Sequence, residues 1–214
     1  MKTAVCFSGY PVLGDYYLHL AQSLEYLVGP FESFWFIPVP FDYSEYIVPF
    51  KIQRIVIQED EDLPNLEGFP ENYNLKTGLE KFLQQIKGWQ QVNELRKRHE
   101  NESGIAYDRV VRCRPDIFFK DLQKIDFDAS LITVPFFDSA YGFNDRFAVG
   151  PRELMDVYMN FFNGIFQNPS LVEDSNAEKA LKRYLTAKEV SVQKDDRIKF
   201  NRIRMSSAGK CFLL

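Results

Sequence analysis

Cysteine and histidine are scarce in this chain of 214 residues, which contains three cysteines and two histidines. Cys6, Cys113 and Cys211 are odd in number and far apart, so they form neither a CxxC pair nor a disulfide framework. This usage favours a reducing compartment, and we expect a cytoplasmic protein. His19 and His99 belong to no His-x-x-His cluster, so we expect neither zinc hydrolase nor Ser-His-Asp chemistry.

Long hydrophobic runs and basic charge are lacking as well. No stretch reaches the roughly 18 apolar residues that span a bilayer, and the apolar part of the N-terminus is too short for a signal peptide. The net charge of −4 gives no support for a nucleic-acid-binding surface. The sequence also has no GxGxxG, no P-loop, no GxSxG elbow and no kinase motif set, which excludes the enzyme classes that these motifs identify.

The residues that are present predict one α/β domain over residues 1–214, with a central mixed, mainly parallel sheet flanked by helices. Hydrophobic residues make up 45% of the chain and aromatic residues 15%, which suffices for one sizeable core. Hydrophobic periodicity distinguishes the two kinds of element. It predicts strands at 3–7, 33–39, 54–58, 107–114, 131–135, 144–150, 190–192 and 200–205, and helices at 14–28, 75–99, 151–167 and 175–187.

The C-terminal residues Cys211-Phe-Leu-Leu214 allow two interpretations. They fit a C-a-a-X prenylation signal, although no polybasic run precedes them. They also fit the cut end of a longer polypeptide, whose apolar residues once packed against something else. We prefer the second interpretation and therefore expect further domains of the same polypeptide.

The most informative stretch is 107–119, which begins as a strand and breaks abruptly. Arg112 and Arg114 are separated by the strand period of two, so their side chains point the same way. Pro115 stops the strand, and Asp116 follows its carboxyl end. Burying these charges is costly unless they have partners. A diphosphate with a divalent cation would satisfy them, and so would an internal Arg–Asp salt bridge; the residues alone leave both readings open.

Two further stretches carry polar residues. The first strand ends in Ser8-Gly9, at the edge where open α/β sheets bind ligands, although an ordinary strand–helix turn explains the same residues. Asp60-Glu61-Asp62 is formally a D-x-D, but it lies in a polar loop where acidic runs are usually solvated. We expect a solvated loop there.

Three motifs in order carry a family resemblance: Phe7-Ser8-Gly9, Arg112-Cys113-Arg114-Pro115-Asp116 and Asn144-Asp-Arg-Phe-Ala-Val-Gly150. With them the chain resembles glycosyltransferases of the GT-A fold. More narrowly, it resembles the N-terminal domain of a multi-domain glycosyltransferase encoded by a chlorella virus. The resemblance covers essentially the whole chain, and it implies a viral protein acting in the host cytoplasm.

The resemblance implies transfer of a hexose or deoxyhexose, of the glucose or rhamnose type, from a UDP-sugar to a glycan acceptor. Asp116 would bind Mn²⁺ or Mg²⁺ as a hard oxygen ligand. Asp145 would face the sugar or the acceptor hydroxyl, and Asp138 is the second candidate catalytic carboxylate. The residues leave the stereochemical outcome open, and the resemblance favours retention. The expected donor-binding residues are Phe7, Ser8, Gly9, Tyr10, Arg112 and Arg114.

The second motif departs from the family's D-x-D because Arg114 replaces the first aspartate. A metal there either loses one protein ligand or shares its role with the Arg114 guanidinium. Two other functions are compatible with the residues: a non-catalytic module that binds a nucleotide-sugar or glycan, and a phosphoryl- or nucleotidyltransferase. Asp145 and Asp138 distinguish the first of these, because a binding module needs no second carboxylate across the cleft.

Overall fold

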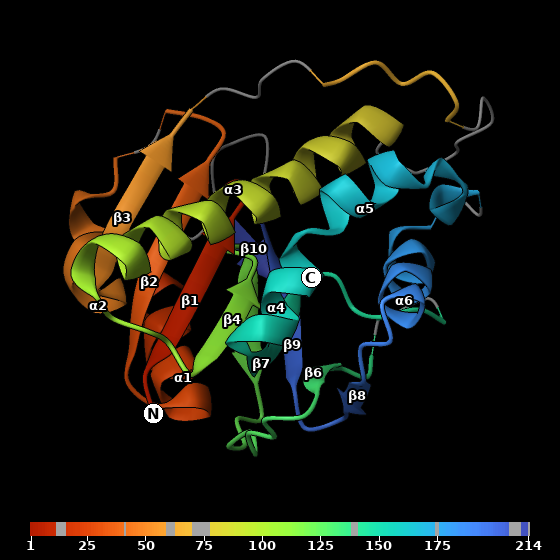
Figure 1. Cartoon of the computed structure of the whole chain (residues 1–214). Coiled ribbons are helices and arrows are strands. Elements are labelled where there is room, and N and C mark those ends of the chain that lie inside the picture. The colour runs from red at the N-terminus through yellow and green to blue at the C-terminus, as the bar shows by residue number, and fades with distance from the viewer. Residues whose placement is uncertain are drawn as a thin grey trace.

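The computed structural model describes residues 1–11, 16–40, 42–58, 63–69, 78–137, 141–173, 176–205 and 211–213. Its strands form a seven-stranded sheet and a three-stranded sheet (Figure 1). The strands are β1 (Thr3–Ser8), β2 (Phe31–Ile37), β3 (Ile52–Ile57), β4 (Arg109–Cys113), β5 (Ile117–Lys120), β6 (Ile132–Pro135), β7 (Phe147–Pro151), β8 (Val192–Asp195), β9 (Lys199–Met205) and β10 (Cys211–Leu213).

The helices are α1 (Tyr17–Val28), α2 (Ile47–Phe50), α3 (Leu79–Ser103), α4 (Arg152–Met159), α5 (Phe161–Gln167) and α6 (Ala177–Ala187), with 3₁₀ turns η2 (Ser44–Tyr46) and η3 (Pro169–Val172). No helix in the described ranges is long and apolar enough to cross a membrane.

The large sheet has the strand order β3-β2-β1-β4-β7-β6-β8. Strands β3, β2, β1 and β4 run parallel to one another, and β6 pairs parallel with β8. Only β7 is antiparallel to both of its neighbours. The small sheet, β10-β9-β5, is antiparallel. The predicted α/β fold with a mixed, mainly parallel sheet flanked by helices is therefore confirmed.

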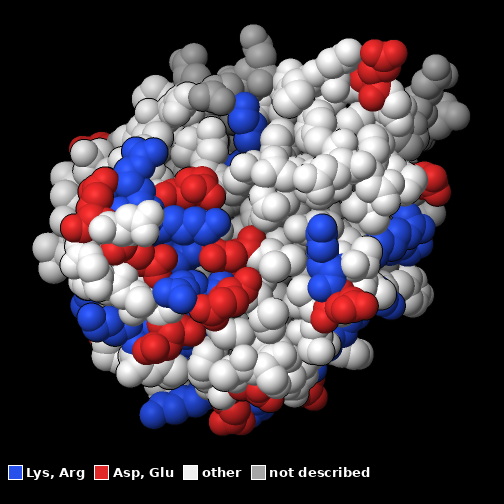
Figure 2. All heavy atoms as spheres, viewed as in Figure 1, with Lys and Arg blue, Asp and Glu red and all other residues white. Residues whose placement is uncertain are grey.

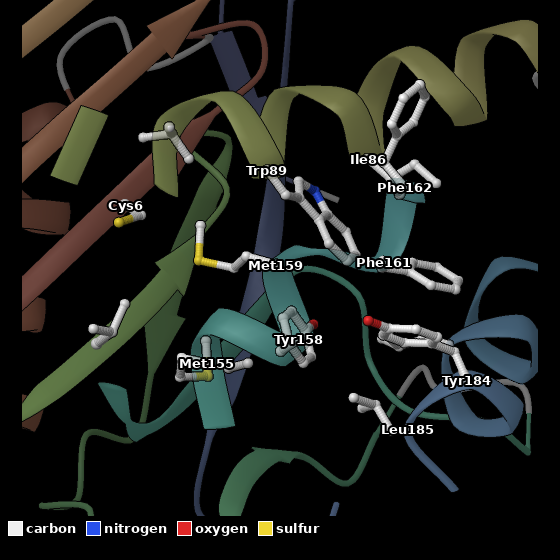
Figure 3. Close-up of a cluster of buried hydrophobic side chains, with 14 of the residues drawn as sticks. Cys6, Ile86, Trp89, Met155, Tyr158, Met159, Phe161, Phe162, Tyr184 and Leu185 are labelled. Carbon is white, nitrogen blue, oxygen red and sulfur yellow. The ribbon is translucent and has the colours of Figure 1, made fainter. Parts of the chain in front are cut away.

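Alternate residues of each strand enter two separate cores, one on each face of the large sheet. In β1, Ala4 and Cys6 join the core under α3, α4, α5 and α6, whereas Val5 and Phe7 join the core under α1 and the small sheet. Figure 3 shows side chains of α3, α4, α5 and α6 converging on the first core, with Trp89 and Tyr158 near its centre. Both faces of the central strands are thus buried, as expected for parallel strands.

Helix α3 runs across one face of the large sheet and is the longest described helix (Figure 1). Its buried stripe follows the predicted helical spacing and includes Phe82, Ile86, Trp89 and Val92. The helix ends at Gly104, whose left-handed backbone lets its N–H bond back to Glu100. The predicted helix 75–99 is confirmed with a later end, while residues 75–77 lie outside the described ranges.

The helical segment after Pro151 and two short strands differ from the prediction. The single helix expected after Pro151 is two helices, α4 and α5, because Asn160 leaves the helical path between them. Helix α6 lies within the predicted helix 175–187 and begins at an N-cap formed by Asn176, whose side chain accepts from the Lys179 N–H at 2.8 Å. Strands β5 and β10 were not predicted. Each is short, and in the described chain each pairs with β9, a contact that the local sequence does not reveal.

Charged side chains on the face shown in Figure 2 are of both signs and gather over the C-terminal half of α3. Arg54 pairs there with Glu102, and Lys97 lies 3.2 Å from Glu94. Such an interleaved surface is a solvated, ion-paired face and not a field of one sign that would attract nucleic acid.

Candidate functional site

A cavity of about 1060 Å³ lies at the carboxyl ends of the parallel strands β1, β2 and β4. This is the edge where open α/β sheets bind ligands. The first turns of α3 form the opposite wall. The lining residues are Ser8, Gly9, Tyr10, Phe36, Pro38, Leu63, Pro64, Leu66, Glu80, Lys81, Gln84, Gln85, Gly88, Arg114, Pro115, Asp116 and Arg204.

The turn after β1 forms the floor of this cavity. Gly9 has φ of +116°, a conformation that side chains other than hydrogen disfavour, and its N–H donates to Phe36 O at 3.3 Å. Gly88 of α3 comes close to this turn: a Cβ added there would lie 3.4 Å from the Cβ of Ser8. Among the described residues the buried Ser8 Oγ has no hydrogen-bond partner. A buried hydroxyl facing a cavity without a partner is available to a ligand.

Phe7 lies below the cavity and not in its wall. Its ring stacks on Trp35 with 4.2 Å between centroids and meets Phe50 edge-on at 5.4 Å. Because Phe7 belongs to the core under α1, a direct contact with a ligand in the cavity is not available in this arrangement. Ser8, Gly9 and Tyr10 do line the cavity. Their role in donor binding stays a prediction.

Arg114 and Asp116 form a bidentate ion pair at the end of β4. The Arg114 Nε donates to Asp116 Oδ1 and its Nη2 donates to Oδ2, both at 2.7 Å. The Asp116 side chain is 6% exposed and that of Arg114 is 20% exposed. Burial raises the pKa of Asp116, but the charge and hydrogen bonds of Arg114 outweigh it and hold that pKa below its ordinary value. The carboxylate is therefore ionised at neutral pH.

Strand β9 brings two more arginines to Asp116. The Ile203 N–H donates to the Asp116 backbone carbonyl at 2.8 Å, and Arg202 Nη2 lies 3.5 Å from Asp116 Oδ2. Arg204, two residues on, lines the cavity. Sequence reasoning placed a strand here but missed both arginines as site residues. The pattern that could have identified them is Arg202-x-Arg204, whose spacing of two places both side chains on one side of a strand.

Arg112 is fully buried and does not line the cavity. Its guanidinium lies over the Trp89 ring, 4.5 Å from the centroid, and donates to the Asp145 backbone carbonyl. Burial lowers the pKa of Arg112 to about 10. Within the described part of the chain its Nε and Nη2 have no hydrogen-bond partner. Of these two arginines, only Arg114 reaches the cavity.

Asp145 lies behind the cavity wall, 7% exposed. Its Oδ2 accepts from Gln85 Nε2 at 2.9 Å, and Gln85 lines the cavity. Burial raises the pKa of Asp145, while Arg146, Arg112 and Arg114 outweigh burial and lower it below its ordinary value. Asp145 is thus an ionised carboxylate that reaches the cavity through the Gln85 amide. Its catalytic role stays a prediction.

The remaining predicted carboxylates, Asp138 and the acidic run 59–62, lie outside the described residues. In the ranges that are described, no three His, Cys, Asp or Glu side chains are grouped so as to hold a metal ion. Asp116, the predicted ligand of Mn²⁺ or Mg²⁺, already shares both carboxylate oxygens with Arg114 and faces Arg202. This arrangement does not offer a divalent cation an open ligand set.

Comparison with known proteins supports the fold. The crystal structure of the apo-form glycosyltransferase GlyE of Streptococcus pneumoniae TIGR4 is similar to this chain, with a TM-score of 0.51 and 12% sequence identity. The match covers 92% of this chain and 46% of that one, so the chain spans less than half the length of GlyE. The chain therefore has a glycosyltransferase-like fold.

The sequence comparisons add a family without a known activity. No curated protein matches this sequence, and the predicted viral origin stays a prediction. Residues 62–203 match the family described as "Domain of unknown function (DUF7796)". This match spans the cavity-lining part of α3, the end of β4 and Asp145. The chain belongs to this DUF7796 family.

Proposed function

We propose that this domain is a glycosyltransferase that moves a hexose or deoxyhexose from a UDP-sugar, of the glucose or rhamnose type, to a glycan acceptor. One observation carries the proposal. Ser8, Arg114 and Arg204 come from three distant parts of the chain and meet at one cavity, at the carboxyl ends of the parallel strands. The cavity presents a buried hydroxyl and two guanidinium groups together, a set that suits a phosphorylated ligand.

In the proposed reaction an acceptor hydroxyl oxygen forms a bond to the anomeric carbon of the sugar. The bond between that carbon and the diphosphate oxygen breaks, and UDP leaves with the electron pair. The acceptor hydroxyl loses its proton to a base or to solvent. Because the leaving group gathers negative charge, cations placed beside it stabilise the transition state. Arg114 and Arg204 line the cavity and are suited to that task.

The amide of Gln85 has a defined orientation that suits sugar recognition. A carboxylate only accepts hydrogen bonds, so the Gln85 group that meets Asp145 must be the Nε2 donor. The Gln85 carbonyl oxygen and the second N–H of the amide are then left for a ligand, and the oxygen accepts from a hydroxyl. We assign Asp145 as the residue that positions Gln85, and Gln85 as a contact for a sugar hydroxyl.

A binding module without catalysis is the second candidate, and the burial of Asp145 favours it. A base must come within hydrogen-bond reach of the acceptor proton, and Asp145 is separated from the cavity by Gln85. Glu80, in the first turn of α3, is an exposed carboxylate on the cavity wall that sequence reasoning missed. An enzyme that needs a base at this wall would use Glu80.

The experiment that separates the two candidates incubates the whole chain with UDP-glucose, UDP-rhamnose and related donors, with and without oligosaccharide acceptors. UDP release and thermal stabilisation are measured in parallel. Acceptor-dependent UDP release supports the transferase. The anomeric proton of the product, read by NMR, reports whether configuration is retained, as the family resemblance implies. Stabilisation by a donor without release under any acceptor supports the binding module. No stabilisation and no release with any donor would refute both.

A further inference from the structure

The carboxylate of Asp116 is occupied as a partner of arginine. Its two oxygens each accept a hydrogen bond of 2.7 Å from Arg114, and Oδ2 lies 3.5 Å from Arg202 as well. A divalent cation prefers several oxygen ligands with free lone pairs and excludes other cations from its shell. At Asp116 a cation would have to displace a guanidinium that is itself largely buried.

The charge around Asp116 is positive on balance. Arg114, Arg202 and Arg204 all act on this carboxylate and outnumber it three to one. On the α3 side of the cavity Lys81 adds a cation and Glu80 adds a carboxylate, so four cations face two carboxylates. In a partly dehydrated cavity such a set repels a divalent cation and attracts a dianion.

Arg114 keeps donors available after it has paired with Asp116. A guanidinium has five N–H groups in one plane, and Asp116 engages one on Nε and one on Nη2. The others remain on the edge of a group that lines the cavity. Because Asp116 holds the guanidinium in one orientation, little side-chain entropy is lost when a phosphate binds it.

Resting on the proposed function, we infer that Arg114 and Arg204 bind the diphosphate of the ligand directly and without a divalent cation. Asp116 orients Arg114 in this arrangement and is not a metal ligand. Arg202 lies behind the pair and keeps Asp116 ionised. The Ser8 hydroxyl, which is buried beside them without a partner in the described chain, donates to the same anion.

The test measures binding by calorimetry with two probes, UDP and inorganic pyrophosphate, in excess EDTA and then in Mn²⁺. Both probes are expected to bind in EDTA, with a dissociation constant that Mn²⁺ changes by less than about threefold. A rise in salt is expected to weaken binding, since salt screens the attraction between the cations of the cavity and the incoming anion. Pyrophosphate tests the arginines without any contribution from the base or the sugar.

The variant Arg204→Gln is expected to weaken the binding of both probes in EDTA by about tenfold or more, as loss of one charge-assisted contact predicts. Arg204 is partly exposed, so this change is unlike one in the core. The matched control is Lys199→Gln, which removes a cation from the same strand at an exposed site that does not line the cavity. It is expected to leave both affinities unchanged.

The outcomes separate this inference from the proposed function. Binding of UDP that requires Mn²⁺ and disappears in EDTA overturns the inference and leaves the glycosyltransferase intact. Binding of pyrophosphate in EDTA, with no nucleotide-sugar bound or turned over, upholds the arginine site and refutes the transferase. An equal loss of affinity in Lys199→Gln and Arg204→Gln would show general charge attraction and would also overturn the inference. Absence of binding by either probe in both buffers refutes inference and function together.

Discussion

Replacing Asp116 by asparagine is expected to destabilise the fold by an amount that depends on pH. The change removes the negative partner of Arg114 while keeping the shape of the side chain. Two unit charges roughly 4 Å apart at a protein site interact by about 4 kcal/mol for an effective dielectric constant of about 20. Removing one partner of a buried pair typically costs about 3–5 kcal/mol.

The expected loss at neutral pH lies at the low end of that range, about 3 kcal/mol of unfolding free energy. Arg114 is 20% exposed and can be partly rehydrated once its partner is gone. Arg202, 3.5 Å from the carboxylate, loses less attraction than Arg114 because it lies farther away. Urea denaturation at pH 7, followed by far-ultraviolet circular dichroism, measures the difference from the wild type.

The pH dependence of this difference gives a second measurement. Because the pKa of Asp116 is lower in the folded chain than its ordinary value of about 3.9, the ion pair stabilises the fold fully above pH ~4. Its contribution is lost as the pH falls through the folded-state pKa. The penalty of Asp116→Asn is therefore expected to be the same at pH 7 and pH 5 and to shrink below about pH 4.

A matched control is Asp128→Asn, at an exposed turn where Asp128 Oδ1 accepts from the Ser130 N–H at 2.7 Å. Its pKa is also below the ordinary value because of hydrogen bonds from Ser130, yet it has no buried cation to leave unpaired. We expect little change in stability. If Asp116→Asn costs less than about 1 kcal/mol at pH 7, or costs the same at every pH, the ion pair does not hold this end of β4 as described.

Three further variants test the packing and the wall of the cavity. Gly164→Ala should destabilise the fold by about 1–3 kcal/mol, because the added Cβ would lie 2.2 Å from the buried Tyr184 ring. Gly88→Ala is the control, because the atom nearest to its added Cβ is 3.4 Å away. In the same urea titration it should be at least as stable as the wild type. Gln85→Leu should lower the free energy of unfolding by about 1–3 kcal/mol, since it leaves Asp145 Oδ2 without its hydrogen-bond partner. It should also abolish thermal stabilisation by the UDP-sugar. Unchanged stability and ligand response in Gln85→Leu would contradict the role given to Asp145.

The sequence alone determined the order and kind of most elements. Strand and helix periodicities are local properties, so the pattern in residues 79–103 or 3–8 indicates a helix or a strand without reference to the rest of the chain. The break at Pro115 is local for the same reason, because proline cannot donate to a strand ladder. These patterns also placed Ser8, Arg114 and Asp116 at strand ends, which is where the cavity lies.

Only the tertiary structure decided which of these residues meet and what they meet. Phe7 and Ser8 are neighbours in the chain, yet one enters a core and the other lines the cavity, because successive strand residues point to opposite faces. The sequence predicted one direction for Arg112 and Arg114. In the structure Trp89 of α3 covers the Arg112 guanidinium, whereas Arg114 lines the cavity.

The partners of Asp116 were also decided by the tertiary structure and not by the sequence alone. The sequence left open whether this carboxylate joins an arginine or a ligand, because a pair of charges two residues apart is compatible with both. The structure decided it by pairing β9 with β5, which brings Arg202 to Asp116 across 86 residues of chain and places Arg204 in the same cavity as Arg114. Pairing of strands so far apart depends on how whole faces pack, and no local pattern contains that information.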